Sequence, residues 1–369
     1  MILTAVQLKN FRCHKDISLN FSESLNYIVG GNGQGKTAIL EAIYYLCTTK
    51  SHNTNSDSEV LKFGEDVFEI SGQFKDLVND VVRIIYSSGE NKKSYLQNGK
   101  HKHRLSEIIG NYPIVLLTPA DHSITFGYPN DRRKFIDSIY CQASSAYLGL
   151  LIDYNKTVRQ RTSLLNSITE NRNQNTSELD AWTQQLLETG LELIEYRKNF
   201  FGEIEPFVKH AYKEILNGEE NPGLKYFFLG GYNGENIRER FVELLEAKRD
   251  DELRRCACLV GPHKDDFVFD INGINLKTFG SQGQHKTFQV ALRFAEFFYL
   301  KEKTGKSPIF LLDDVFGELD VARSVRISEN LRKVGQTFIT LTDFTNISYL
   351  SKQSTDTVIR LMNGKAIYA

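Results

Sequence analysis

A lysine and a threonine at the end of a glycine-rich segment have the types and spacing that phosphate binding requires. The segment GGNGQGKT at residues 30–37 fits the pattern G-x-x-x-x-G-K-[ST]. Glycines let successive backbone N–H groups point toward anionic oxygens, and the start of a helix adds further unpaired N–H groups. We expect Lys36 to reach the β- and γ-phosphates of a nucleoside triphosphate, and the Thr37 hydroxyl to bind Mg²⁺.

The sequence around this segment predicts the structural context that a phosphate loop needs. Residues 25–29 (LNYIV) read as a buried strand, and residues 38–46 (AILEAIYYL) as a helix. The alternative is a glycine-rich turn that Thr37 merely caps. The strand, loop and helix together favour a nucleotide site. Its predicted nucleotide-binding residues are Gly30, Asn32, Gly33, Gly35, Lys36 and Thr37.

Two aspartates near the other end of the chain could complete this site. Asp313 and Asp314 follow the apolar run IFLL at residues 309–312, which predicts a buried strand with carboxylates at its carboxyl end. Asp313 suits the magnesium shell of a P-loop enzyme, and Asp314 could orient or deprotonate the attacking water. An acidic pair after a strand can also be a simple helix cap. Because the chain also has the lysine loop, we favour the catalytic reading and predict Lys36, Asp314 and Ser281 as catalytic residues.

Ser281 belongs to a second anion-binding turn, SQGQ at residues 281–284, which precedes an apolar helix predicted over residues 287–303. We expect Ser281, Gly283 and Gln284 to contact nucleotide. Thr342 and Asp343 end a further strand predicted from residue 336 and are candidates to sense the γ-phosphate. Arg12 precedes the phosphate loop closely and is either a nucleotide contact or a solvated arginine.

Composition limits the class of protein. The 369 residues suggest two domains, and 41% hydrophobic with 25% charged residues is ordinary for a globular protein. The net charge is −1, so any DNA-binding surface must be a local patch. Five dispersed cysteines without a C-x-x-C motif favour reduced thiols. We see no signal peptide or membrane-length apolar run and therefore expect a cytoplasmic protein.

A local basic patch is predicted between residues 91 and 106. This stretch contains a hairpin signal, Asn98-Gly99, and no acidic residue. Its five fixed positive charges could contact DNA phosphates, or they could form a solvated edge that prevents strand aggregation. The predicted DNA-binding residues are Lys92, Lys93, Lys100, Lys102 and Arg104.

The middle of the chain predicts a helical insertion. Apolar residues recur at helical spacing from about residue 135 to 218, with a polar break at residues 170–177. The motif GPHKDD at residues 261–266 follows a strand predicted to begin near Cys258. His263, Asp265 and Asp266 could serve a metal, but a charged turn is the simpler reading, and catalytic and structural roles both remain open for them.

Taken together, the motifs resemble those of ABC-type ATPase heads from DNA-repair and chromosome proteins, and over nearly the whole length those of the bacterial RecF family. The motifs that carry the resemblance are LKNFR at residues 8–12, GGNGQGKT at 30–37, DRRKFID at 131–137, GPHKDD at 261–266, GSQGQ at 280–284, LLDDV at 311–315 and ELD at 318–320. The chain has Asn53 where the resemblance leads us to expect arginine in many relatives.

The resemblance implies an α/β fold: an ABC-type P-loop ATPase head with mixed sheets around a central helix and an inserted α-helical domain. We predict the head from residues 1–118 and 256–369, and the helical arm from residues 119–255. The resemblance further implies a homodimer around two ATP molecules with Mg²⁺, in which Ser281 and Gly283 of one copy cap the γ-phosphate held by Lys36 of the other. It also implies binding of duplex and gapped DNA, partnership with RecR and RecO, and help in loading RecA during gap repair and the SOS response.

Other P-loop classes fit the sequence less well. A transporter subunit is disfavoured because 244 positions separate Thr37 from Ser281. An SMC-like chromosome ATPase would need a longer heptad arm than the broken helical region here. A metabolic kinase leaves residues 281–284 unexplained. Asp314 stands where transporter-type heads usually have glutamate, which reaches roughly 1.5 Å farther, so we predict slow ATP hydrolysis. The resemblance further implies that DNA stimulates this hydrolysis.

Overall fold

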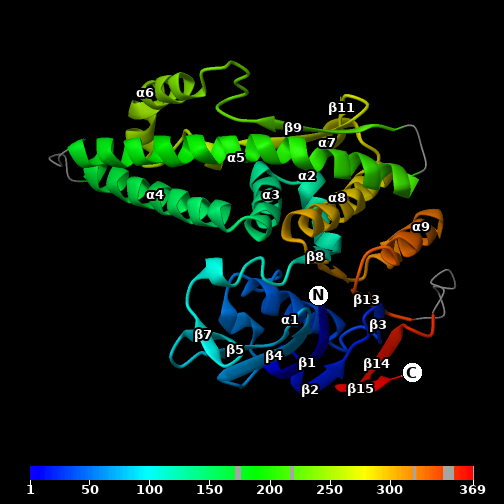
Figure 1. Cartoon of the computed structure of the whole chain (residues 1–369). Helices are drawn as coiled ribbons and strands as arrows, with labels where there is room; N and C mark the ends of the chain where they lie inside the picture. The colour runs from blue at the N-terminus through cyan, green and yellow to red at the C-terminus, as the bar shows by residue number, and fades with distance from the viewer. Residues whose placement is uncertain (171–175, 217–219, 319–320, 344–352, 369) are drawn as a thin grey trace. The chain divides into compact units, whose positions relative to one another are not determined.

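The computed structural model describes residues 1–170, 176–216, 220–318, 321–343 and 353–368. The chain divides into two compact units (Figure 1). Unit 1 comprises Met1–Asp121, His210–Glu219 and Lys286–Ala369, and unit 2 comprises His122–Lys209 and Glu220–His285. Residues 256–285, which the sequence assigned to the head, therefore cluster with the helical unit.

One of the two described sheets of unit 1 is largely parallel. Its strand order is β15-β14-β3-β13-β12-β8, and all neighbours are parallel except the β14–β15 hairpin. Every residue of the four strands β3, β8, β12 and β13 is buried, as expected for parallel strands covered on both faces. The strand bounds are β3 Leu25–Val29, β8 Ile114–Leu117, β12 Ile309–Leu312, β13 Thr337–Leu341, β14 Thr357–Met362 and β15 Lys365–Tyr368.

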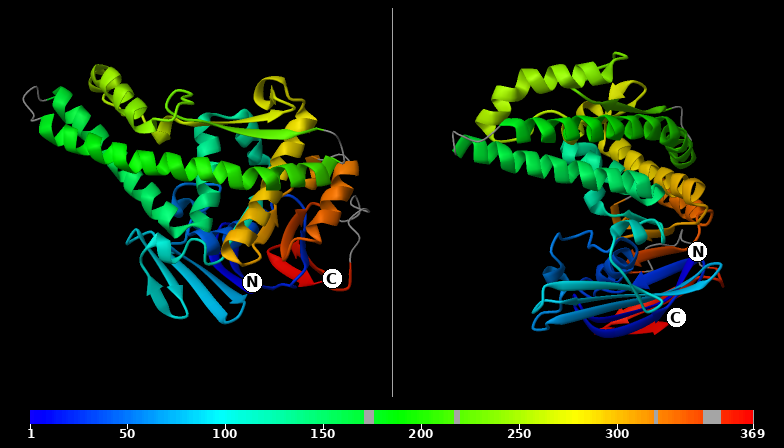
Figure 2. Two further views of the ribbon diagram at one scale, coloured as in Figure 1. Left: turned by 45° about the horizontal axis from the view of Figure 1, so that its top comes forward. Right: turned by 60° about the vertical axis from the view of Figure 1, so that its left-hand side comes forward.

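The second sheet of unit 1 is antiparallel, in the order β2-β1-β4-β5-β6-β7, and its blue to cyan strands lie side by side in Figure 2. Alternating buried and exposed residues along β4 and β5 show that one face packs inward. The strand bounds are β1 Ile2–Phe11, β2 His14–Asn20, β4 Val67–Lys75, β5 Asn79–Ser87, β6 Lys92–Gln97 and β7 Lys100–Lys102.

Helix α1 (Lys36–Thr48) follows β3 directly and packs against strands of both sheets. Its apolar residues Ile39, Ile43 and Leu46 are fully buried in one core with residues of β1, β4 and β12. The predicted strand, glycine loop and central helix are therefore confirmed. Because this helix is clamped between two sheets, the phosphate loop at its start has a rigid support. Helix α9 of unit 1 spans Val321–Leu331.

Unit 2 is mainly helical and contains a three-stranded sheet, β11-β10-β9. Helices α4 and α5 run alongside each other in green in Figure 1, and Leu165 of α4 packs against Leu179 of α5. The helix bounds are α2 His122–Phe126, α3 Pro129–Ala143, α4 Ser145–Glu170, α5 Thr176–Leu216, α6 Ile237–Arg255, α7 Leu276–Phe279 and α8 Gln282–Thr304. The strands are β9 Pro222–Phe227, β10 Asp266–Ile271 and β11 Ile274–Asn275. By sequence, the end of α5 from His210 and most of α8, from Lys286 onward, belong to unit 1.

The strand predicted from Cys258 is wrong. Residues 258–260 form no strand, and the first strand in this region is β10, which begins inside the GPHKDD motif. The short segment lies between two positive-φ residues, Cys256 at 50° and Gly261 at 127°. The Cys258 thiol contacts the Val158 carbonyl of α4, so the segment packs onto a helix instead of pairing with a strand.

Candidate nucleotide site

The glycine loop between β3 and α1 has a backbone that other residues could not adopt easily. Gly33 and Gly35 have φ values of 78° and 86°, in the left-handed region. A Cβ on Gly35 would lie 2.4 Å from Cys13 Sγ and 2.5 Å from His14 Nε2. A Cβ on Gly30 would lie 2.8 Å from the Leu361 carbonyl oxygen. The loop is therefore held closely by β14 and by the segment that joins β1 to β2.

Lys36 folds back over the loop that precedes it. Its Nζ donates hydrogen bonds to the carbonyls of Gly30 at 2.7 Å and Gly31 at 3.0 Å. Burial lowers the pKa of the Lys36 ammonium, and the nearby Asp314 and Asp313 carboxylates oppose that effect. Phosphate oxygens are stronger acceptors for an ammonium than neutral carbonyls. Lys36 can therefore exchange these carbonyl contacts for a triphosphate.

Thr37, in the first turn of α1, meets Asp313 at the carboxyl end of β12. The Thr37 hydroxyl donates to Asp313 Oδ1 at 3.0 Å, and the Thr340 hydroxyl of β13 donates to the same oxygen at 2.8 Å. The Asp313 side chain is buried. Hydroxyl and carboxylate oxygens are the ligands that Mg²⁺ prefers. The donor set thus fits a magnesium ion held by Thr37 and Asp313, and that ion would supply charge neutralisation for bound phosphates.

Asp314 has a different environment from its neighbour. Its side chain is exposed, its backbone φ is 52°, and its N–H donates to the Thr340 hydroxyl at 2.9 Å. A non-glycine residue at positive φ is uncommon and is often found at functional sites. Thr340 therefore fixes the backbone of Asp314 and the carboxylate of Asp313 with one side chain.

Arg12 is engaged by the protein itself. Its Nε and Nη2 donate to the two Glu41 oxygens at 2.8 and 2.6 Å, and its Nη1 donates to the Glu59 carbonyl at 2.8 Å. The hydrogen bond with Glu41 raises the pKa of the Arg12 guanidinium, against the effect of burial. Arg12, between β1 and β2, is therefore held against α1 by its ion pair with Glu41. Its contact with a nucleotide stays a prediction.

The SQGQ turn lies at the start of α8, in unit 2, and its helix begins five residues earlier than the sequence predicted. The Ser281 hydroxyl accepts from the Gln284 N–H at 3.2 Å, and the Gln284 side chain accepts from the Ser281 N–H at 2.8 Å. This reciprocal pair is a capping box. Ser281 is exposed, whereas Gly283 is half-buried. The turn therefore presents an ordered helix N-terminus at the surface of unit 2.

His285 directly follows this turn and packs against α2. Its ring is buried and stacks on Phe126 of α2, with centroids 3.5 Å apart, and Phe126 stacks in turn on His122. Burial lowers the pKa of His285 to about 4, so the ring is neutral at ordinary pH. A Cβ on Gly280 would lie 2.5 Å from the Leu276 carbonyl oxygen, which shows how tightly α7 and α8 meet.

The remaining predicted nucleotide residues are exposed. Asn32 lies in the glycine loop, and Thr342 and Asp343 follow β13. Asp343 therefore shares a sheet edge with Asp313 and Asp314, since β12 and β13 are adjacent and parallel. Of the predicted ELD motif, Leu319 and Asp320 lie outside the described residues.

The predicted basic patch divides between the two ends of β6. The predicted Asn98-Gly99 hairpin turn is confirmed, with φ values of 51° and 77°. Lys100 and Arg104 are exposed near this turn, with Lys102 half-buried between them. Lys92 is exposed at the opposite end of the strand, across from Ser87.

Lys93 differs from the other four basic residues. Its Nζ pairs with Asp57 at 2.7 Å, donates to the Thr49 carbonyl at 2.8 Å and lies 5.3 Å from the Tyr45 ring centroid. These contacts tie β6 to α1 and to the segment after it. Lys93 is therefore a structural side chain in this state.

The motifs DRRKFID and GPHKDD meet inside unit 2. Arg132 pairs with Asp266 at 2.7 Å, and Arg133 donates to the Asp265 carbonyl at 2.6 Å. The third cation is Arg197 of α5, which is buried and pairs with Asp137 at 2.9 Å and Asp265 at 3.5 Å. Within the described residues, no cluster of histidine, cysteine and acidic side chains could hold a metal. The acids of GPHKDD thus join α3, α5 and β10.

His263 of the same motif is also a structural group. Its Nδ1 lies 2.6 Å from the Tyr154 hydroxyl, and its Nε2 lies 3.0 Å from the Cys258 carbonyl oxygen. Burial lowers the pKa of His263 to about 4. The neutral imidazole can serve both partners, donating from one nitrogen and accepting at the other.

Sequence reasoning missed three residues that organise the site. Thr340 bridges the two aspartates, Glu41 holds Arg12, and the Gln34 side chain accepts from the Asn363 N–H at 3.0 Å. Thr340 and Glu41 are polar residues within otherwise apolar buried elements. That signal could have found them. Gln34 has no comparable signal, because its partner is a backbone group 329 positions away.

Comparison with known proteins agrees with this geometry. The family model described as AAA domain matches residues 5–248. The chain is 38% identical over 353 residues to the DNA replication and repair protein RecF of Chloroherpeton thalassium, covering 93% of this chain and 95% of that protein. It is 33% identical to the protein of the same name from Ligilactobacillus salivarius, covering 99% and 97%.

Solved structures give the same result. A structure of the recombination mediator protein RecF with ATP, from the RecFOR pathway, matches with a TM-score of 0.90 and 30% identity, covering 100% of this chain and 97% of that one. An Smc head bound to a domain of ScpA matches with a TM-score of 0.57 and 15% identity, which shows a shared fold.

The phosphate loop, the strand-end aspartates and the two sheets around α1 define an ABC-type P-loop ATPase, related in fold to SMC heads. Within that class, the chain belongs to the RecF family of DNA replication and repair proteins. No helix among the described residues has the length and apolar character needed to cross a membrane.

Proposed function

We propose that this protein is an ATP-dependent recombination mediator that binds Mg²⁺-ATP, pairs with a second copy and grips DNA near single-strand gaps. The hydrogen bond between Thr37 and Asp313 carries the nucleotide part of the proposal. It brings a loop hydroxyl and a strand-end carboxylate to one place, which is the ligand pair of a P-loop magnesium site. Lys36, beside them, supplies the cation for the phosphates.

Hydrolysis in this proposal is slow and stimulated by DNA. Asp314 is the exposed acid next to the proposed metal ligand Asp313, and the Thr340 hydroxyl fixes its backbone. An aspartate side chain reaches roughly 1.5 Å less far than a glutamate, so it holds an attacking water less closely. Slow hydrolysis suits a protein that holds DNA for a limited time better than it suits a motor.

ATP joins two copies in this proposal. Ser281 and Gly283 of one copy complete the charge of the γ-phosphate held by Lys36 of its twin, because a helix N-terminus stabilises an anion. The capping box orders that terminus, and Ser281 is exposed. Moving a monomer–dimer balance from 1:99 to 99:1 needs about 5.5 kcal/mol of differential affinity, and the closing contacts on two nucleotides would supply it.

The DNA and protein partners follow from the family. The solved relative is described as a recombination mediator of the RecFOR pathway. We therefore propose duplex and gapped DNA as ligands, RecR with RecO as partners, RecA loading as the outcome and the cytoplasm as the location. Lys92, Lys100, Lys102 and Arg104 are the proposed phosphate contacts. The predicted division into a discontinuous head and a helical arm is retained as part of the proposal.

Sedimentation velocity of the full chain tests the central step. We expect a monomer with Mg²⁺ alone, and a dimer with Mg²⁺ and a slowly hydrolysed ATP analogue. Gapped duplex DNA should strengthen the dimer, and blunt duplex of equal length should do so less. A protein that stays monomeric at saturating nucleotide, with gapped DNA present, would contradict the proposal.

A further inference from the structure

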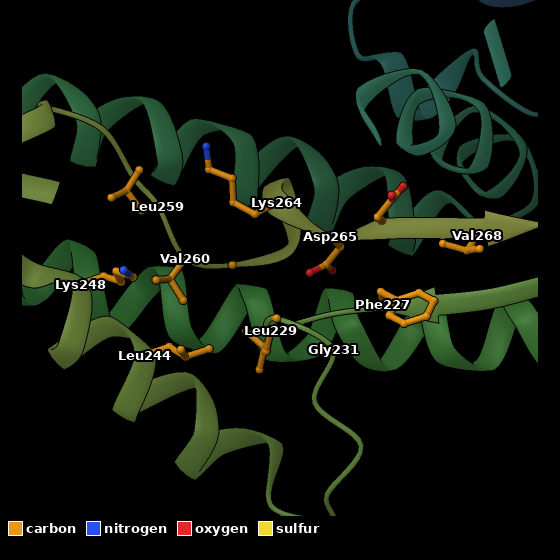
Figure 3. A pocket seen from close by; sticks show the side chains of 13 residues that line it. Phe227, Leu229, Gly231, Leu244, Lys248, Leu259, Val260, Lys264, Asp265 and Val268 are labelled. Atoms are coloured by element: carbon orange, nitrogen blue, oxygen red, sulfur yellow. The ribbon is translucent and has the colours of Figure 1, made fainter. Parts of the chain in front are cut away.

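A cavity of about 640 Å³ lies within unit 2, and no proposed nucleotide or DNA contact lines it (Figure 3). Its walls come from the end of β9, the segment after it, α6, the segment before GPHKDD and the start of β10. Six apolar side chains line it: Phe227, Leu229, Leu244, Leu259, Val260 and Val268. Gly230 and Gly231, both at positive φ, turn the chain away from the end of β9 and leave this space open. Volumes of this size accommodate one or two side chains or a small ligand.

An edge strand leads into this cavity. β9 pairs with β10 and forms one edge of the described three-stranded sheet. Its side chains alternate: Tyr226 stacks against Phe201 and Phe267, whereas Lys225 and Phe227 point outward and are exposed. Phe227, the last residue of β9, is 43% exposed and also lines the cavity. Such an edge offers backbone hydrogen bonds to an added strand, with a pocket next to it for a side chain.

The lysines at the cavity are less firmly paired than its acids, because the ion pair of Lys248 with Asp251 is an exposed surface pair and Lys264 is exposed. The two acids of the cavity are already matched, because Asp265 pairs with buried Arg197 and Asp266 pairs with Arg132. Lys264 is exposed at one wall, and Lys248 of α6 stands at another, 3.3 Å from Asp251. An extended ligand with carboxylates beside its apolar side chain therefore complements this rim.

We propose that the edge of β9 and the adjoining cavity dock an extended, acidic and apolar peptide segment of a partner protein. The segment adds a strand beside β9, inserts one apolar side chain between Leu229, Leu244 and Val260, and places carboxylates near Lys248 and Lys264. A strand rather than a small molecule is the occupant, because Phe227, the last residue of the edge strand β9, itself lines the cavity. None of the residues proposed to contact nucleotide or DNA lines this site.

Fluorescence anisotropy with a designed peptide tests the site. The probe is a labelled seven-residue peptide in which leucine or phenylalanine alternates with aspartate or glutamate. Two comparison peptides replace the acids with lysine, or the central residue with proline, which cannot donate a strand hydrogen bond. We expect saturable binding of the acidic peptide, stronger at low ionic strength, and at least about tenfold weaker binding of both comparison peptides.

Variants of the protein then locate the site. Leu244→Glu places a carboxylate in the cavity and should weaken the acidic peptide by about tenfold or more. The double variant Lys248→Glu/Lys264→Glu should weaken it about tenfold at low ionic strength. Lys134→Glu, a single charge reversal at an exposed position of α3, is the control for one lysine and should leave binding unchanged. The melting temperature and ATPase rate of each variant establish that it folds.

Three results would overturn the docking site. One is equal affinity for the acidic and lysine peptides. Another is unchanged binding in folded Leu244→Glu. The third is nucleotide-free self-association of the wild type that Leu244→Glu abolishes, which would assign the cavity to a second copy of this chain.

Discussion

The Thr37 hydroxyl donates a 3.0 Å hydrogen bond to the Asp313 carboxylate across 276 positions of sequence. It joins the first helix of the chain to the strand that carries the acidic pair. Asp313 also accepts a hydrogen bond from Thr340. Replacing its carboxylate by an amide would therefore remove the charge from the proposed magnesium site and keep one side-chain oxygen as an acceptor.

Asp313→Asn should therefore abolish magnesium-dependent hydrolysis with limited loss of stability. We expect a fall in the ATPase rate of about 100-fold or more, since a P-loop enzyme depends on its metal for charge neutralisation. Steady-state phosphate release measures it, and Asp16→Asn, an exposed aspartate on β2, is the matched control. A variant with near wild-type turnover would exclude Asp313 as a metal ligand.

Asp314→Asn should separate binding from hydrolysis. The amide cannot take a proton from water, so hydrolysis should fall by about 100-fold or more. ATP affinity, measured with a fluorescent analogue, should change little, because Asp314 is not a proposed ligand of phosphate or metal. Asp314→Glu should hydrolyse faster than the wild type, since its carboxylate reaches farther. Unchanged hydrolysis in Asp314→Asn, with ATP binding intact, would show that Asp314 is not the base.

Ser281→Arg should block the dimer and leave nucleotide binding by the single copy unchanged. The larger cationic side chain fills the exposed start of α8, where the twin's γ-phosphate would approach. We expect sedimentation to show a monomer with ATP analogue and Mg²⁺, with the ATP affinity retained. Asn155→Arg, at an exposed position within α4, is the control and should still dimerise. Dimerisation of Ser281→Arg would argue against the closing role of this turn.

The basic hairpin should contribute to DNA affinity regardless of base sequence. Reversing Lys100, Lys102 and Arg104 to glutamate should weaken binding to gapped DNA by tenfold or more at about 0.1 M salt and reduce the dependence on salt. Anisotropy titrations over a salt series give both quantities. Unchanged affinity and salt slope would remove the hairpin from the interface.

Lys93 gives a contrasting prediction within the same hairpin. Its ammonium already pairs with Asp57 and the Thr49 carbonyl. Lys93→Ala should therefore lower the free energy of unfolding by about 1 kcal/mol and alter DNA binding less than the hairpin reversal does. Chemical denaturation compared with Lys92→Ala measures the difference.

His263 should make stability depend on pH. Its pKa is about 4 in the folded protein, against an ordinary value of 6.5, so the unfolded chain binds the additional proton. The contribution of His263 to the free energy of unfolding is complete above pH 6.5. This contribution decreases by about 3 kcal/mol at most as the pH falls toward 4. His263→Gln, which keeps a donor and an acceptor, should flatten this part of the stability profile from denaturant titrations. An unchanged profile would show that His263 is not the titrating group.

The local parts of the site could be predicted from sequence because short-range chemistry determines them. The glycine pattern determines the loop between β3 and α1, and Asn98-Gly99 determines the turn between β6 and β7. The α/β class and the family followed from such motifs. Long-range contacts carry no comparable signal. A polar residue in an apolar element marks Glu41 and Thr340 as unusual, but their partners Arg12 and Asp313 depend on how distant elements pack, which no local pattern encodes.

The GPHKDD region shows the same limit. The segment from Cys258 to Val260 is short and apolar. Such a segment is compatible with a buried strand and equally with a loop packed on α4. Only the position of α4 decides between them. The role of Asp265 was equally open, since its partner Arg197 lies on another helix, α5.

The central strand β3 lies between β13 and β14, which are made more than 300 residues later. A ribosome must therefore translate almost all of this sequence before β3 has a neighbour on either side. Until then the apolar strand and its glycine loop have no neighbouring strand in this sheet and are accessible to chaperones and proteases. The sheet that supports the glycine loop can for this reason form only after almost the whole chain has been synthesised, and a chain truncated before β13 would lack both neighbours of β3.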